Sequence, residues 1–522
     1  MKDLRKIAIW TFPVVAISIV VLLMIGGCKN PDNTGLLGFT IDYNMKIRPV
    51  FTDPIFRQIG YDWNDPHSEY MAKSVGIQYG EKDYILDQRF LIDLMQGASR
   101  TLDITSPMIN NSDIVAMMVG LATRGVQIRI VTEKSNFDFI DPSIPEQTRQ
   151  VQQQLIDAGV QIRTDNDDAN RLMHERYMII DNTYLLVGSA DFLSTSFSEA
   201  INDTIVIESL PTISDPASAT AANVHTVMDA FIFDFEQMFN RGKFGVMKEP
   251  LYNNTFEDTG TKIEVYFGPT NNIIEQIVDE LNNADDIMFY AIQQFTNGNM
   301  LNNMAIMNGN IEVRGIIDSI TNVPADTLAA IGAVTFDGMG YNTMNHKYIV
   351  IDFPLDTFDY EYPTPGNSSD PVVITGSPNW NESNFSRNDE DLIVIHDLAT
   401  AYMYGLVEFQ SNMLGAQQVG MIYGEVRSAV NNVPLESTVE IRVERKGFLP
   451  GLPVDEPETA DSDPETGWYE AFVPGGLTDV TVTDAPEMYL LPDWIAGEEL
   501  LFPGGSQRIY WYLPLKPTGS GT

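Results

Sequence analysis

A histidine and an arginine lie two residues apart in the segment 174–181, which reads His-Glu-Arg-Tyr-Met-Ile-Ile-Asp. In an extended strand, residues two apart project from the same face, so His174 and Arg176 are expected to point the same way. A guanidinium can hold phosphate oxygens, and an imidazole can attack phosphorus or transfer a proton. Asp181 ends an apolar run and could orient the imidazole, as the carboxylate of a catalytic triad does. The segment is typical of a site for an anionic, phosphate-bearing substrate.

The chain carries a second version of this segment at residues 345–352, Asn-His-Lys-Tyr-Ile-Val-Ile-Asp. Its cation Lys347 and its aspartate Asp352 keep the spacing of the first copy, but its first residue is Asn345 rather than a histidine. His346 lies one residue late, and a shift of one residue in a strand turns a side chain to the opposite face. The second copy thus keeps its phosphate-binding parts, while its histidine is out of register.

The two segments belong to two copies of a longer repeat, expected at residues 78–248 and 262–415. In each copy amphipathic helices alternate with apolar strands, a glycine-serine turn follows the aspartate, and a last strand closes the unit. This order predicts an α/β fold of two pseudo-symmetric halves, each a sheet with its helices. Two copies with unrelated ligands are the alternative to a cleft shared between the halves, which is the commoner arrangement for a small-molecule site.

Composition restricts which phosphates can approach. The chain has 522 residues, with 31 Lys and Arg against 72 Asp and Glu, a formal net charge of −41. Nucleic-acid binders gain much of their affinity from basic side chains, so this charge disfavours a nucleic acid as partner. An insertion at residues 353–370 adds acidic and aromatic side chains after Asp352. It would repel a DNA strand if it lies at the cleft mouth, whereas a solvated loop at the far edge of the sheet is the alternative.

Residues 1–28 predict export. A basic start precedes an almost wholly apolar run, residues 7–25, which ends in two glycines and Cys28. The layout resembles a bacterial lipoprotein signal, whose cleavage leaves the cysteine as a lipidated N-terminus. An uncleaved membrane-spanning segment is the alternative. In both cases we expect an exported protein attached to the membrane of the cell envelope, at the outer membrane or cell surface, with residues 29–77 as tether and extension.

Residues 420–516 consist of short alternating segments separated by glycine, proline and asparagine. This pattern predicts a small all-β sandwich. The segment resembles carboxypeptidase regulatory-like and related immunoglobulin-like modules, and we expect it to act in adhesion or as a spacer. An acidic run at residues 456–465 is interpreted as a solvated loop, since its prolines and irregular spacing do not fit a cation loop.

Taken together, the two copies resemble the phospholipase D superfamily over roughly residues 78–415. The family signature is His-x-Lys, four residues, Asp, then Gly-Ser and an Asn two residues beyond the Ser. Ser377 and Asn379 match this turn in the second copy, and Glu390 matches the closing Asn-x-Glu of the family. The resemblance implies phosphodiester chemistry without a metal or cofactor. One motif histidine attacks phosphorus, the other protonates the leaving alcohol, and water or another alcohol resolves the phosphohistidine.

Three positions depart from the family pattern. Arg176 keeps the charge of the motif lysine in another shape. In the first copy the turn reads Ser189 and then Asp191, which places a carboxylate near the phosphate-binding site that the resemblance implies. Asn345 stands where the second histidine belongs, so the expected proton donor is missing unless the displaced His346 or another group replaces it.

These observations leave three interpretations open. The favoured one is a membrane-anchored phosphodiesterase with His174 as nucleophile, acting on a phospholipid or other small phosphodiester, and a nuclease is less favoured. The second is a catalytically impaired surface lipoprotein that binds phosphate or lipid headgroups. The third gives the motif histidines structural roles only. Outside the motifs, ordinary packing or surface roles are expected for His225 and His396. Because both halves lie in one chain, a monomer is expected to complete the site.

Overall fold

The computed structural model describes most of the chain from Met45 onward. The described residues are 45–52, 84–137, 143–165, 170–258, 260–285, 287–321, 323–336, 343–352, 370–409, 419–444, 458–474, 476–492, 496–501, 506–509 and 511–516. The chain divides into two units, Met1–Asn44 and Met45–Thr522, and every described residue belongs to the second. The predicted signal and Cys28, nearly all of the predicted tether and most of the acidic insertion lie outside the described residues. Among those described, no helix has the length and apolar character needed to cross a membrane.

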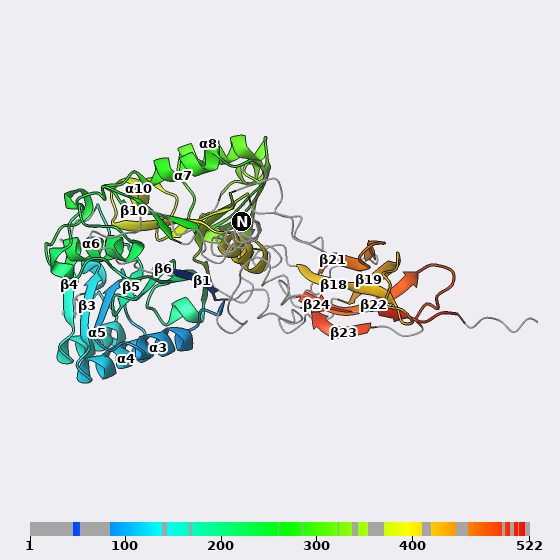
Figure 1. Cartoon of the computed structure of the whole chain (residues 1–522), viewed down its shortest axis with the longest axis horizontal. Coiled ribbons are helices and arrows are strands. Elements are labelled where there is room, and N and C mark those ends of the chain that lie inside the picture. The colour runs from blue at the N-terminus through cyan, green and yellow to red at the C-terminus, as the bar shows by residue number, and fades with distance from the viewer. Residues whose placement is uncertain are drawn as a thin grey trace, which may run out of the picture. The chain divides into compact units, whose positions relative to one another are not determined.

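A seven-stranded sheet forms the first half, in the order β1-β8-β6-β5-β2-β3-β4 (Figure 1). Its strands are β1 (Lys46–Phe51), β2 (Thr101–Thr105), β3 (Gln127–Thr132), β4 (Gln161–Thr164), β5 (Tyr177–Ile180), β6 (Tyr184–Gly188) and β8 (Asp203–Glu208). Helices α3 (Gln88–Gln96), α4 (Ser112–Thr123) and α5 (Glu146–Asp157) share a buried apolar cluster with this sheet. Asp87 and Asn111 accept hydrogen bonds from the first-turn amides of α3 and α4, which fixes where these helices begin.

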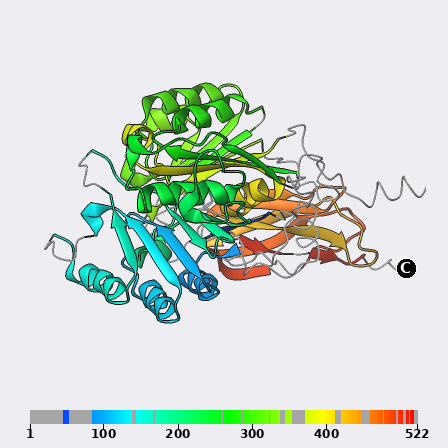
Figure 2. The same ribbon diagram turned by 60° about the vertical axis from the view of Figure 1, so that its left-hand side comes forward.

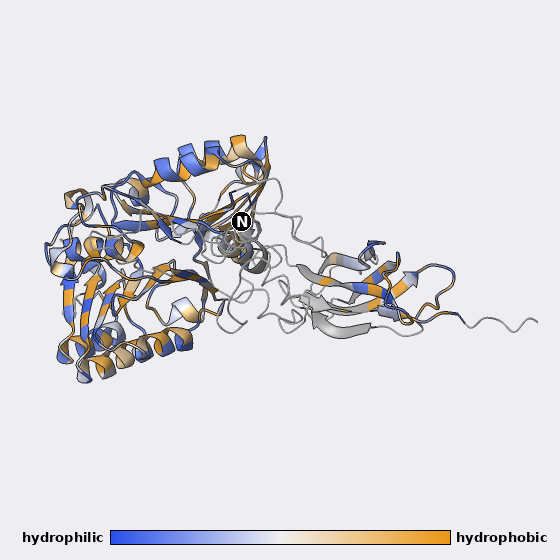
Figure 3. Ribbon diagram, viewed as in Figure 1, coloured by the Kyte–Doolittle hydropathy of each residue, from blue (hydrophilic) through white to orange (hydrophobic). Residues whose placement is uncertain are grey.

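An eight-stranded sheet forms the second half, in the order β13-β12-β11-β15-β16-β17-β10-β9. Its strands are β9 (Thr255–Asp258), β10 (Thr261–Gly268), β11 (Ile287–Ile292), β12 (Glu312–Asp318), β13 (Ala333–Phe336), β15 (Lys347–Ile351), β16 (Val372–Gly376) and β17 (Glu390–His396). Helices α7 (Ile273–Asn282), α8 (Gly298–Asn308) and α9 (Ala325–Ala330) pack against it. Hydrophilic and hydrophobic residues alternate along α7 and α8, as in helices that bury one face (Figure 3).

The two sheets repeat one topology. The order β8-β6-β5-β2-β3-β4 in the first sheet corresponds to β17-β16-β15-β11-β12-β13 in the second. In both series the first three pairings are antiparallel and the last two are parallel. β1 and β10 each add an antiparallel strand next to the closing strand. The predicted α/β class is confirmed, while the exact boundaries of the predicted halves stay predictions.

A central helical layer joins the halves. Helix α6 (Val227–Phe239) is buried along almost its whole length, because one apolar cluster contains its side chains together with those of both sheets (Figures 1 and 2). The ring of Phe231 contacts Tyr177 of β5 edge-on, with centroids 5.0 Å apart, and Phe267 of β10 at 5.2 Å. The short strands β7 (Ala200–Ile201) and β14 (Thr343–Met344) pair in parallel and so tie the first half to the second motif.

The C-terminal segment forms two further small sheets. One has the order β21-β18-β24, with β25 also paired to β18, and the other has the order β20-β19-β22-β23. The strands are β18 (Val419–Ser428), β19 (Thr438–Glu444), β20 (Glu458–Asp461), β21 (Trp468–Pro474), β22 (Gly476–Asp484), β23 (Ala496–Leu501), β24 (Ser506–Arg508) and β25 (Trp511–Leu513). One buried cluster contains residues of both sheets, Ile422 and Val480 among them. The module type, a carboxypeptidase regulatory-like sandwich, stays a prediction.

Candidate active site

Each motif is held by the closing segment of the other half. The amide of His174, just before β5, donates a hydrogen bond to the carbonyl of Asp389, just before β17, with N and O 2.9 Å apart. The amide of Asn345, just before β15, donates to the carbonyl of Ile201 at 2.8 Å, shortly before β8. The two motifs, about 170 residues apart in sequence, therefore meet where the halves face each other.

His174 is oriented by Glu390. Its Nδ1 lies 2.9 Å from Oε2 of this fully buried carboxylate, which also accepts a hydrogen bond from Oγ of Ser377 at 2.5 Å. Burial alone would raise the pKa of Glu390, but the neighbouring imidazole and the hydroxyl hydrogen bond hold it below its usual value. Burial, followed by the charge of Arg176, lowers the pKa of His174. The imidazole is thus neutral at pH 7, as a nucleophile must be.

Arg176 contacts the other ring nitrogen of His174. Its Nη2 lies 3.0 Å from Nε2, and its Nε donates to Oδ1 of Asp191 at 2.7 Å. The guanidinium also lies 3.3 Å from Nδ1, but the nearer partner of Nδ1 is the carboxylate of Glu390, which can only accept. Nδ1 is therefore assigned the proton and Nε2 the acceptor role toward Arg176. A phosphate held by Arg176 would therefore lie beside the nitrogen that has a lone pair available for attack.

The second motif places an amide at the corresponding position. Nδ2 of Asn345 donates to Oδ1 of Asn202 and to the carbonyl of Ser189, both at 2.8 Å. Nζ of Lys347 donates to the carbonyl and to Oδ1 of Asn345, at 2.7 and 2.6 Å. The cation of each motif thus contacts the first residue of its own motif.

Hydrogen bonds at the two glycine-serine turns show which residues of the halves correspond. The amide of Ser189 donates to the carbonyl of Asp203 at 2.9 Å, and the amide of Ser377 donates to the carbonyl of Asp391 at 3.0 Å. The residues directly before these two aspartates therefore occupy corresponding positions in the halves.

Those preceding residues are Asn202 and Glu390. Glu390 contacts His174, whereas Asn202 contacts Asn345. Where one half has a histidine with a carboxylate, the other half has two amides. Asn202 was not predicted from the sequence, although Asn-Asp and Glu-Asp stand at the start of the last strand of the two copies and could have revealed the pair.

His346 does not join this group. It is fully buried, with Nδ1 2.8 Å from Oδ1 of Asp203 and Nε2 2.7 Å from Oε1 of Glu408. Burial alone would lower its pKa, but the hydrogen bonds to Asp203 and Glu408 raise it to about 9. This placement contradicts the hypothesis that a displaced His346 protonates a leaving group, because side chains alternate along a strand and both ring nitrogens face carboxylates.

The carboxylates of the motif aspartates bind backbone amides of turns away from the site. The carboxylate of Asp181 accepts hydrogen bonds from the amides of Ser99, Arg100 and Thr101 at 2.7–2.8 Å, and that of Asp352 accepts one from the amide of Asp285 at 3.0 Å. β5 separates Asp181 from the site by about 15 Å, at roughly 3.3 Å per residue. The expectation that Asp181 orients an imidazole is therefore wrong, since Glu390 does so.

The structure thus divides the predicted site residues into two sets. The residues that it brings together around the facing motifs are His174, Arg176, Ser189, Asp191, Asn345, Lys347, Ser377 and Glu390. Asp181, Asp352 and His346 lie apart from them. Asn379 is buried, and within the described residues its amide oxygen accepts no hydrogen bond.

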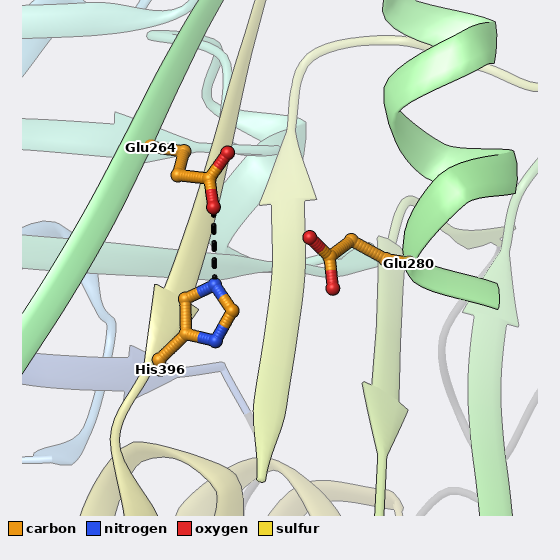
Figure 4. A group of neighbouring side chains, drawn as sticks. All are labelled: Glu264, Glu280 and His396. Atoms are coloured by element: carbon orange, nitrogen blue, oxygen red, sulfur yellow. Dashed lines mark hydrogen bonds and ion pairs between the residues drawn. The ribbon is translucent and has the colours of Figure 1, made fainter. Parts of the chain in front are cut away.

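A separate charged cluster lies at the other end of β17 (Figure 4). His396 Nε2 is 3.3 Å from Oε1 of Glu264, and Glu280 of α7 faces both, with potential ligand atoms all within 4.8 Å of one another. Nζ of Lys262 already lies 2.6 Å from Oε1 of Glu264. Burial alone would lower the pKa of His396, but its hydrogen bonds to Glu264 and Asp370 raise it. Lys262 and His396 thus pair with Glu264 and Asp370, with Glu280 beside them, and we propose no metal for this cluster.

Comparison with known proteins gives one family. The family described as cardiolipin synthase, PLD-like domain, matches residues 91–223 and 277–410, together about half of the chain. Over 123 residues, 24% of this chain, the sequence is 32% identical to the mitochondrial cardiolipin hydrolase of Chlamydomonas reinhardtii. The match spans 50% of that relative, so the chain covers about half the length of the curated relative it matches.

Two solved structures are similar at low sequence identity. Phosphatidylserine synthase from Haemophilus influenzae Rd KW20 has a TM-score of 0.41 and 11% identity, over 60% of this chain and 80% of that one. Polyphosphate kinase from Porphyromonas gingivalis has a TM-score of 0.40 and 11% identity, over 67% of this chain and 47% of that one.

Proposed function

We propose that this chain, which belongs to the family described as cardiolipin synthase, PLD-like domain, is a metal-independent phosphodiesterase that acts through a phosphohistidine. The proposed substrate is a phospholipid or another small phosphodiester. The observation that carries the proposal is the arrangement of His174 between Glu390 on Nδ1 and Arg176 on Nε2.

Each group in this arrangement has a chemical role. Nε2 of His174 attacks phosphorus, and the P–O bond to the leaving alcohol breaks. Glu390 stabilises the imidazolium-like charge on the ring through Nδ1, as carboxylates do beside catalytic histidines. Arg176 and Lys347 bind the non-bridging oxygens and stabilise the negative charge of the transition state. Water then attacks phosphorus and releases His174.

Charge and attachment support the substrate class. With a net charge of −41, the chain repels a long polyanion more than a single diester next to two buried cations. Lipidation at Cys28, which we also propose, would hold the protein at an envelope membrane, beside phospholipid. The C-terminal sheets would then act as a spacer or adhesion module.

The test uses the full-length chain in detergent micelles, with EDTA and an activated aryl phosphodiester. Wild type is expected to turn over and to form a His174 adduct that is detectable after rapid denaturation, whereas His174→Ala is expected to do neither. His225→Ala, which removes an exposed histidine outside the site, is the matched control and should keep full activity. Equal rates for wild type and His174→Ala would refute the proposal.

One observation favours a second function, that of a phosphate- or headgroup-binding surface lipoprotein without turnover. The pair Asn345–Asn202 stands where a histidine and a carboxylate would supply an acid. This function predicts saturable binding of a soluble phospholipid headgroup without turnover. Lys347→Ala should weaken that binding, and unchanged affinity would rule it out.

A further inference from the structure

Resting on the proposed function, we propose that Lys347 donates the proton to the leaving alcohol, in place of the histidine that the second motif lacks. The phosphodiesterase would then use one histidine as nucleophile and one lysine as general acid.

The residues at the position of the missing histidine cannot take this role themselves. Asn345 and Asn202 are amides, whose nitrogens do not release protons near neutral pH. Both ring nitrogens of His346 face carboxylates in the buried interior. A leaving alcohol would therefore depart as an alkoxide unless another group protonates it.

Lys347 is held beside this position by neutral oxygens. Its side chain is buried, and Nζ donates to the carbonyl and Oδ1 of Asn345, with Oε1 of Gln293 at 3.5 Å. Among the described residues no carboxylate lies within salt-bridge distance of it. Lys248, an equally buried lysine, instead contacts three carboxylates, which hold its pKa well above the usual value despite burial. The surroundings of Lys347 suit a group that must lose a proton.

Burial and the charges around Lys347 also favour loss of its proton. Burial, followed by the positive charge of Arg176, lowers the pKa of Lys347 to about 7. Asp191, Asp203 and Glu390 oppose this shift but do not cancel it. A lysine with such a pKa is protonated in part of the population at neutral pH and can also take the proton back, which is the condition for a general acid that later acts as base.

The other acids near the site already have different contacts. Burial raises the pKa of Asp391 to about 7, but its Oδ1 accepts a hydrogen bond from the amide of Arg176. It also follows Glu390 directly in β17, so its side chain points to the opposite face. Asp191 is bound by the guanidinium of Arg176, and Glu390 by His174.

The proposed steps balance in protons and bonds. In the first, Nε2 of His174 bonds to phosphorus, the P–O bond to the alcohol breaks, and the alcohol oxygen takes a proton from Nζ of Lys347. In the second, the neutral amine takes a proton from water as the water oxygen bonds to phosphorus. The P–N bond then breaks and returns both side chains to their starting states.

The experiment compares two leaving groups in Lys347→Arg, which keeps the positive charge but cannot lose a proton near neutral pH. A 4-nitrophenyl diester needs little protonation of its leaving group, whereas an alkyl diester needs it strongly. Lys347→Arg should cleave the alkyl substrate about 10²–10⁴-fold more slowly than wild type. It should cleave the aryl substrate within about tenfold of wild type, which also shows that the variant is folded and its site intact.

Arg176→Lys is the matched control, because it alters the other cation without removing the proposed donor. It should slow both substrates by a similar factor. If Lys347→Arg slows both substrates equally, then Lys347 serves only as a phosphate-binding cation and this inference is overturned. A different result would contradict the proposed function itself, namely the absence of a His174 adduct in wild type.

Discussion

Arg176 and Glu390 fix the orientation of His174, the proposed nucleophile. Glu390 accepts a hydrogen bond from Nδ1 of His174, and Arg176 donates a hydrogen bond to Nε2. The carboxylate therefore sets which nitrogen can attack. Glu390→Gln removes the charge that stabilises the ring during attack, and it places an amide nitrogen where the carboxylate only accepts hydrogen bonds, from Ser377 on one oxygen and from two asparagines on the other. We expect a 10²–10⁴-fold fall in kcat, measured with the aryl diester, and an unchanged melting temperature would show that the loss is chemical.

The pH dependence follows from the signs of two pKa shifts. His174 must be neutral, and its lowered pKa extends activity to pH values below 6.5, the usual pKa of a histidine. Lys347 must be protonated for alkyl substrates, and its pKa of about 7 makes their cleavage fall as pH rises above neutral. The aryl diester should lack this alkaline decline. Initial rates from pH 5 to 9 with both substrates test the difference, and identical profiles would contradict the assignment.

The amide pair offers a gain-of-function test. Asn345→His combined with Asn202→Glu would place a histidine and a carboxylate where the two amides now contact each other, like the pair that His174 and Glu390 form. In a protein that also carries Lys347→Arg, the double change should raise the rate of alkyl-diester cleavage at least tenfold over Lys347→Arg alone. Asn345→His alone should recover less, because its imidazole would lack a carboxylate. No difference between the single and double changes would show that Asn202 does not correspond to Glu390 in function.

Strands β5 and β15 each have residues of the candidate site at one end and a structural aspartate at the other. Each strand has a site residue before or at its start and an aspartate after its end, and these aspartates adopt positive φ of 52° in both copies. Asp181 binds the turn that leads into β2, and Asp352 binds the turn before β11. The first residues of each motif therefore belong to the candidate site, whereas its aspartate fixes how β5 or β15 meets the neighbouring strand.

Asp181→Ala should therefore affect stability rather than catalysis. It removes an acceptor for several amides at a partly exposed turn, with an expected loss of about 1 kcal/mol in the free energy of unfolding. The kcat of the folded variant should stay within about twofold of wild type. Denaturant unfolding and kinetics of the same preparation test this, and a large fall in kcat without loss of stability would return Asp181 to the catalytic group.

At the scale of the whole molecule, buried charges join the halves. His346 comes from the second motif, while its partner Asp203 belongs to β8 of the first sheet. The raised pKa of His346, about 9, means that the folded state holds this proton more tightly than the unfolded chain. The resulting stability is fully present below pH 6.5 and is lost as pH rises through 9, with a size on the order of 3 kcal/mol.

His346→Gln should abolish much of this pH dependence. Wild type is expected to lose melting temperature between pH 7 and 10, whereas the variant should be less stable at pH 7 and change less over that range. Differential scanning calorimetry at several pH values measures both. A parallel decline in the two proteins would show that His346 does not link the halves in this way.

The sequence alone determined the repeat, the α/β class and the family, because these depend on local periodicity and on motif spacing within continuous segments. It also showed that Asn345 breaks the motif. Only the tertiary structure revealed that Glu390 reaches His174, that Asn202 reaches Asn345 and that His346 is buried between two carboxylates. These contacts join residues 62 to 216 positions apart in the chain. A local pattern can show that Asn202 and Glu390 correspond, but it does not show which residues of the other half they contact, because these contacts form only when two sheets pack on one central layer.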